Sequence, residues 1–228
     1  MKKLFFLLLV CVTTNLYAVP VKYTCDIPFW WNRTPINAQC GDTLYRSKEK
    51  ARLALDRFLK KYPKRVIRKN LKRVVFVRYI ELYGVEYGAT YEYNVLYIST
   101  DRNSNSVKDL EEKLHHEFSS VLMDNHNFKS KRWKSISKRY VSEDDYGRSH
   151  VGDKDAFRGS KSLYKKGFVV KYGSTDMEND VNTYAEFLFV SPKRLKSIAK
   201  RYEKVYHKTR LLKGFYCSID KNFKFCGE

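Results

Sequence analysis

The stretch that decides the fold runs Leu114-His115-His116-Glu117-Phe118-Ser119-Ser120-Val121-Leu122. It lies within residues 106–123, where apolar side chains recur every three or four positions, so the spacing predicts an amphipathic helix. At about 100° per residue, five apolar side chains share one core stripe: Val107, Leu110, Leu114, Phe118 and Val121. The opposite face of the second half carries His116, Ser119, Ser120 and Met123, with Glu117 on its flank. A solvated face in so basic a chain should carry Lys or Glu, so we infer that this half is covered on both sides and that His116 and Glu117 face an internal cleft.

Strands precede this helix and a second polar-faced helix follows it. Residues 74–82 and 89–98 are dense in β-branched and aromatic residues, which predicts two strands. The turn-rich residues 101–106 can cap the helix. Residues 178–189 form a further predicted helix whose core stripe holds Val181, Tyr184, Ala185 and Leu188. Its far side carries Glu186 among Asn179, Asn182 and Thr183.

The rest of the chain is expected to surround this centre. Residues 19–46 look like loop with an exposed aromatic run, 47–61 like a helix that ends before Pro63, and 192–212 like one closing helix. Residues 129–140 interleave aromatic and basic side chains. They fit either a solvated surface stretch or loop, or a contact with anionic polymers by phosphate binding and stacking.

The central segments resemble the zincin-like bacterial zinc metallopeptidases of the gluzincin type, including the lethal-factor-like peptidases. His116-Glu117 is similar to the first half of their H-E-x-x-H motif, and residues 178–189 are similar to the helix that supplies a Glu as third ligand. The resemblance covers roughly residues 73–190. It implies an α+β zincin-like fold, in which a mixed sheet is followed by an active-site helix and a second, Glu-bearing helix.

The resemblance also implies roles for individual residues. His116 and Glu186 would be zinc ligands, and Glu117 the catalytic base that activates zinc-bound water. That water would attack a carbonyl of a peptide or protein substrate lying along the edge of the preceding sheet. Tyr184 and Tyr172 are candidates to donate a hydrogen bond to the oxyanion.

The motif departs from the family at its second histidine, because Ser120 stands four residues after His116. A hydroxyl is a poor zinc ligand. Three alternatives stay open. His115 or His126 replaces the missing ligand, or metal binds weakly through His116, Glu186 and waters, or the chain is a metal-free descendant whose fold binds something else.

The chain ends and its charge suggest an exported protein. Residues 1–18 combine Lys2 and Lys3, a short apolar run and Ala18, which predicts a signal peptide followed by a single domain, 19–228, without a transmembrane span. With 45 Lys and Arg against 25 Asp and Glu, the net charge is +20. A periplasmic or extracellular location is expected. A non-enzymatic basic envelope protein that binds anionic polymer or a protein partner is therefore the alternative function.

Four cysteines remain after the predicted leader: Cys25, Cys40, Cys217 and Cys226. An even number in an exported chain predicts disulfides. Three connectivities are possible, and closeness in sequence favours Cys25 with Cys40 and Cys217 with Cys226. The disulfides would then staple the two ends of the fold.

Overall fold

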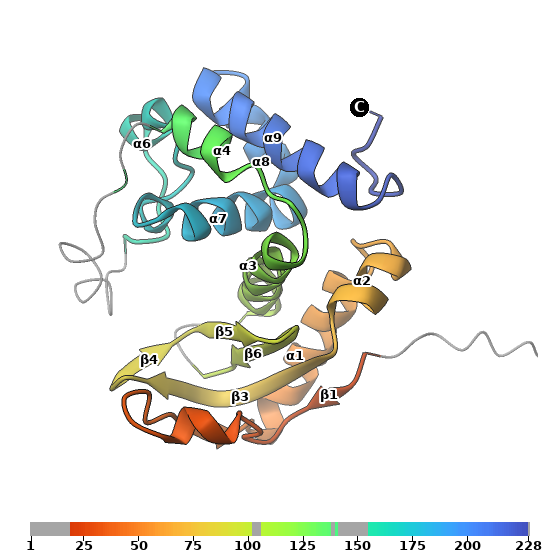
Figure 1. Ribbon diagram of the computed structural model, residues 1–228, viewed down its shortest axis with the longest axis vertical. Helices are drawn as coiled ribbons and strands as arrows, with labels where there is room; N and C mark the ends of the chain where they lie inside the picture. Colours follow the sequence, from red (N-terminus) through yellow and green to blue (C-terminus); the bar gives the residue numbers. More distant parts are fainter. Residues whose placement is uncertain (1–18, 102–105, 138–139, 141–154, 228) are drawn as a thin grey trace, which may run out of the picture.

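A computed structural model describes residues 19–101, 106–137, 140 and 155–227; the predicted signal peptide lies outside these residues. Their order is that of an α+β protein with one mixed sheet (Figure 1). In this part of the chain the sheet has six strands: β1 (Val21–Lys22), β2 (Gln39–Asp42), β3 (Arg73–Leu82), β4 (Val85–Tyr87), β5 (Ala89–Glu92) and β6 (Val95–Ser99).

The long strand β3 organises the sheet. It pairs in parallel with β1 and β6 and antiparallel with β2 and β4, and the main order is β1-β3-β6-β5. Because both faces of β3 are covered, its apolar run is nearly continuous. Val74 and Phe76 enter the main core, whereas Val75 and Val77 enter a smaller one on the other face. The order leaves β5 at the edge of the described sheet.

The predicted strand 89–98 is wrong as a single element, because a tight turn divides it into β5 and β6. Tyr93 and Asn94 have φ of 45° and 67°, as both central residues of a two-residue hairpin of type I′ require. The strands pair antiparallel on either side of them, with Glu92 opposite Val95. Asn favours this turn, but Tyr does not, so composition alone concealed it.

Helix α3 (Val107–Asn125) packs between the sheet and helix α7 (Met177–Val190) (Figure 1). A capping box begins α3: Ser106 accepts from the Asp109 amide, and the Asp109 carboxylate accepts from the Ser106 amide. Every residue from Leu114 to Leu122 is buried. The prediction that the second half of this helix is covered on both sides is confirmed.

Other helices complete the layer around α3 and α7. They are α1 (Tyr45–Leu59), α2 (Lys64–Asn70), α4 (Ser130–Ile136), α6 (Lys161–Lys166), η2 (Tyr172–Ser174), α8 (Pro192–Ala199) and α9 (Glu203–Ile219). The short helix η1 (Phe29–Asn32) instead covers the other face of the sheet, where Trp31 packs in the smaller core. The predicted single helix 192–212 is wrong: extended backbone at Tyr202 separates α8 from α9. The loop-like stretch 19–46 contains two strands and η1, and only part of its aromatic run is exposed, since Trp31 is buried.

The basic segment 129–140 is also more ordered than a solvated stretch. Its residues Ser130–Ile136 form α4, and Trp133 on that helix is fully buried. At the chain ends the cysteines pair as favoured, Cys25 with Cys40 and Cys217 with Cys226. Among the described residues, no helix combines the length and apolar character needed to cross a membrane.

Candidate functional site

An ion pair between α3 and α7 forms the centre of the site. His116 Nδ1 lies 2.6 Å from Glu186 Oε1, and both side chains are nearly buried. Burial acts against the imidazolium, but the hydrogen bond and charge of Glu186, with the charge of Glu117 and a hydrogen bond with Asn179, raise the pKa of His116 to about 9. His116 is therefore a cation at neutral pH, held by a carboxylate.

Glu117 is the second titratable group of the site. Burial raises the pKa of its carboxyl to about 7; the neighbouring His116 charge lowers it, and the charges of Glu178 and Glu186 raise it further. A carboxyl with a pKa near neutrality can take or give a proton under physiological conditions. Glu117 has the properties that an acid or base needs.

A second polar pair joins the same helices one turn away. Asn182 Nδ2 donates to Ser120 Oγ over 2.7 Å, and both side chains are buried. Ser120 follows His116 by four residues, and Asn182 precedes Glu186 by four, so the two pairs lie on facing turns of antiparallel helices. The position at which the H-E-x-x-H motif carries its second histidine is thus occupied by a serine bonded to an amide.

The edge strand β5 follows α3 past this site. Two contacts show this. At one end, Gly88 precedes β5 and lies so close to Lys113 that an added Cβ would be 3.5 Å from Lys113 Cε. At the other end, the Tyr91 hydroxyl on β5 donates to Asp124 Oδ2 over 2.9 Å. Glu117 lies on α3 between these two points. On the other side of the site, the Tyr172 ring lies 5.9 Å from the His116 ring, and burial, then the charge of Glu117, raise the pKa of the Tyr172 phenol.

His115 is not brought to the site, because it lies about 100° around the helix from His116. Its Nδ1 is 2.9 Å from the Tyr62 hydroxyl, and its ring stacks on Phe189 at 4.7 Å. Burial lowers its pKa to about 4, so it is neutral. The structure places the predicted ligand His115 in the aromatic core. The other candidate, His126, has its Nε2 at 3.1 Å from Asn70 Oδ1.

Tyr184, a candidate oxyanion donor, is not brought to His116 either. Its hydroxyl donates to the Gly167 carbonyl over 2.9 Å, and its ring packs edge-on against Trp133 in the fully buried interior. This position follows from the apolar stripe on which Tyr184 lies. Tyr172 is the tyrosine that approaches His116.

Sequence reasoning missed a buried charged network beside Tyr184. Asp180 Oδ2 forms an ion pair with Lys208 and accepts from Trp133 Nε1 and from the Tyr140 hydroxyl, each over 2.8 Å. Asp180 and Lys208 are fully buried. The network joins α7, α9 and α4. A signal was present, since Lys208 falls at the helical spacing of Val205 and Leu212, both apolar.

The donor set does not fit a three-ligand zinc site. His116 and Glu186 are suitable ligands, but a catalytic zinc takes three protein ligands, and the third position is Ser120, whose hydroxyl is bonded to Asn182. In the described part of the chain, no three side chains of His, Cys, Asp or Glu are grouped so that they could hold a metal ion.

One comparison with known proteins gives a result. A family model described as "Putative zinc-binding metallo-peptidase" matches residues 78–215, more than half of the chain. No curated protein and no solved structure matches.

Proposed function

The chain belongs to the family that this model describes, and from that premise we propose that it binds extended peptides beside His116 and Glu117 without a catalytic zinc ion. One observation carries the proposal. The two α3 positions that carry the zinc-binding histidines in the H-E-x-x-H motif each bond to a side chain of α7: His116 to Glu186, and Ser120 to Asn182. Metal binding at His116 would need its neutral imidazole and would have to break the hydrogen bond between His116 and Glu186.

The edge of the sheet supplies a place for the peptide. Ser99 N donates to Gly88 O, so Gly88 and Ser99 are a hydrogen-bonded pair, and bonded pairs alternate along an antiparallel ladder. The N–H groups of Ala89 and Tyr91 therefore point away from β6. An extended peptide can pair with them, as in β-strand addition, and it would then run past Glu117.

Glu117 and Tyr172 contribute polar contacts in this proposal. A carboxyl with a pKa near 7 can accept from a peptide N–H when ionised, and donate to a peptide carbonyl when protonated. Hydrolysis by the route of the zinc peptidases would need more than this, because there a metal ion lowers the pKa of the attacking water.

Zinc-dependent peptide hydrolysis is the second candidate, and one observation favours it. His116 and Glu186 form an ion pair and the Glu117 charge acts on His116; the resemblance gives these three residues the roles of two zinc ligands and the catalytic base. The two functions differ in whether the unmodified chain holds one zinc ion.

Metal analysis of untagged protein, incubated with zinc and desalted, distinguishes peptide binding without zinc from zinc-dependent hydrolysis. We expect the wild type to retain far less than one zinc per chain and to leave casein uncleaved. Ser120→His completes the motif, and we expect it to approach one zinc per chain, lost again in His116→Ala/Ser120→His. Because Ser120 is buried, Ser120→His/Asn182→Ala provides a version with added space. A stoichiometric zinc in the wild type that His116→Ala removes would overturn the proposal and establish the metal site.

Peptide binding is tested at the sheet edge with fluorescently labelled, unfolded casein as the probe. Ala89→Pro removes an outward N–H without breaking the β5–β6 ladder. Loss of one hydrogen bond of about 1 kcal/mol predicts roughly five-fold weaker binding by fluorescence anisotropy. The matched control Ala89→Val keeps the N–H and should bind like the wild type. Equal binding by Ala89→Pro and Ala89→Val would refute pairing at this edge.

The compartment is part of the proposal. Two disulfide pairs are compatible with export to the periplasm or the outside of the cell. The predicted leader and the proposed anionic envelope polymer rest on sequence reasoning alone. A secreted or periplasmic reporter fusion to residues 1–18, compared with one that lacks them, measures export directly.

A further inference from the structure

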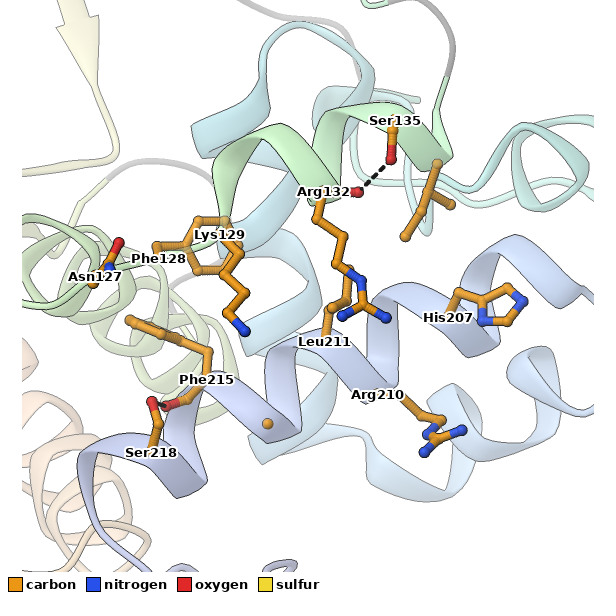
Figure 2. A pocket seen from close by; sticks show the side chains of 12 residues that line it. Asn127, Phe128, Lys129, Arg132, Ser135, His207, Arg210, Leu211, Phe215 and Ser218 are labelled. Atoms are coloured by element: carbon orange, nitrogen blue, oxygen red, sulfur yellow. Dashed lines mark hydrogen bonds between the residues drawn. The ribbon is translucent and has the colours of Figure 1, made fainter.

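An open groove lies between α4 and α9, on elements other than α3, α7 and the sheet edge that form the candidate site (Figure 2). Its volume is about 480 Å³. Three features decide what the groove can bind: cationic side chains on α4 and α9, an apolar floor, and Gly214. Figure 2 shows Lys129 and Arg132 on the side of α4 and Arg210 on α9.

The groove has a strong excess of positive charge. Lys129, Arg132 and Arg210 are exposed, and none of the residues that line the groove is acidic. Within the described ranges, no carboxylate lies at ion-pair distance from any of these three cations. The nearby His207 is 3.3 Å from Glu203 on its own helix. Cationic side chains on both helices, with Lys129 and Arg132 on the side of α4, make the groove a favourable place for an anion.

The floor of the groove is apolar. Phe128, Leu211 and Phe215 line it, and the rings of Phe128 and Phe215 pack edge-on at 5.0 Å. These side chains extend the main core to the surface, since Phe215 is a core residue and the other two pack against it. A charged opening above an apolar floor suits a molecule that has an anionic end and an apolar end.

Gly214 keeps this floor open. It lies inside α9, where glycine costs roughly 1 kcal/mol relative to alanine. Backbone conformation does not require it, because its φ is not positive, and packing does not require it, because an added Cβ would meet no atom within 4 Å. The structural effect of glycine here is to leave the groove unfilled.

We propose that this groove binds a small anionic amphiphile, in which an apolar chain or ring is joined to a phosphate or carboxylate group. The cations hold the anionic group at the opening, and the apolar part lies on Phe128, Leu211 and Phe215. A volume of about 480 Å³ falls within the range of small-molecule sites. The net charge of +20 raises the rate at which any such anion arrives.

Calorimetric titration with four probes, each below its micelle concentration, tests the chemistry. Decyl phosphate and decanoate carry both features, inorganic phosphate carries only charge, and decyl maltoside carries only the chain. We expect at least one of the two anionic amphiphiles to bind ten-fold or more tightly than inorganic phosphate and decyl maltoside, and the better of the two identifies the headgroup. Equal affinity for decyl phosphate, decanoate and inorganic phosphate would overturn the proposal.

Variants then locate the binding. Gly214→Leu fills the floor and should bring the affinity for the amphiphile down to that for inorganic phosphate. Arg132→Ala/Arg210→Ala should weaken binding at least ten-fold and reduce its salt dependence. The matched control Arg65→Ala/Arg68→Ala removes the same charge from exposed positions of α2 and should bind like the wild type. Gly214→Met, which carries a long unbranched side chain into the same open space, serves with the same expected loss if Gly214→Leu does not fold. A loss in the α2 control equal to that in the groove variant contradicts a defined site.

Discussion

Glu186 Oε1 lies 2.6 Å from His116 Nδ1, and one turn along the same interface Asn182 binds Ser120. Two facing turns of α3 and α7 are thus joined by one charged and one neutral pair. In a metallopeptidase a metal ion would link these elements. Here His116 bonds directly to Glu186 and Ser120 to Asn182, so both contacts contribute to folding stability.

The charged pair predicts a stability that falls as the pH rises. The folded pKa of His116, about 9, exceeds its ordinary value of 6.5, so the stabilisation is fully present below pH 6.5 and is lost as pH rises through 9. Glu117 contributes a fall at lower pH, between 4.5 and 7. Urea unfolding between pH 7.5 and 9.5 therefore lies above the range of Glu117 and includes that of His116. We expect the free energy of unfolding to drop by about 2 kcal/mol over that range.

Glu186→Gln is the matched control for this pH dependence. It keeps the size of the side chain and removes the charge that raises the His116 pKa. We expect this variant to be less stable than the wild type at pH 7.5 and to approach it at pH 9.5. Parallel curves for the two proteins would show that the ion pair does not set the pH dependence.

The buried pair of Asp180 and Lys208 predicts a large loss when one partner is removed. Lys208→Met leaves the Asp180 carboxylate without its cation in a fully buried position. Breaking a buried pair in this way costs about 3–5 kcal/mol. Chemical denaturation at pH 7.5 measures the loss. Removal of the charge, not of the packing, is the cause, because Met retains most of the apolar stem.

A double variant tests that cause. Asp180→Asn/Lys208→Met removes both charges, and the Asn oxygen can still accept from Trp133 and Tyr140. We expect it to recover more than half of the stability that Lys208→Met loses. If the stability lost in the double variant equals the sum of the losses in Asp180→Asn and Lys208→Met, the two side chains do not interact energetically.

Hydrophobic periodicity predicts the helices that bury one apolar stripe, but it fails where a local backbone conformation divides an element in two. The helices at His116 and Glu186 follow from spacing and from unusually uncharged faces, and α3 begins at the Ser106 cap. The split of the second strand depends on Tyr93 adopting φ of 45°, which its own preference disfavours. The break between α8 and α9 carries no Pro or Gly, so no ordinary breaker marked it.

The site was predictable to the extent that helix geometry fixes it. His116 and Glu186 were placed on polar faces, and the structure puts those faces together. The pairing of side chains between α3 and α7 depends on how the two helices are aligned along their axes. A single sequence does not determine that alignment. The sequence therefore marks Asn182 only as a polar residue, and it leaves His115 among the candidate ligands although the His115 side chain points from α3 toward Phe189 and Tyr62.

Tyr184→Phe separates a structural role from a catalytic one. The variant loses only the hydrogen bond to the Gly167 carbonyl, which also accepts from Lys208. We expect a loss of about 1 kcal/mol in unfolding free energy and no change in casein binding. Tyr172→Phe is the comparison, because Tyr172 lies beside His116; weaker casein binding in that variant alone supports the assignment. Weaker casein binding by Tyr184→Phe would instead show that the Tyr184 hydroxyl contributes to the site.

His115→Phe tests whether this histidine is a core residue. Phenylalanine can keep the stack on Phe189 and the contact with Phe58, but it removes the hydrogen bond between His115 Nδ1 and the buried Tyr62 hydroxyl. We expect a loss of about 1–3 kcal/mol in unfolding free energy, and Tyr62→Phe/His115→Phe should recover most of it by removing that hydroxyl. Zinc retained by Ser120→His should be the same with and without His115→Phe. A zinc content that depends on His115 would instead return it to the ligand set.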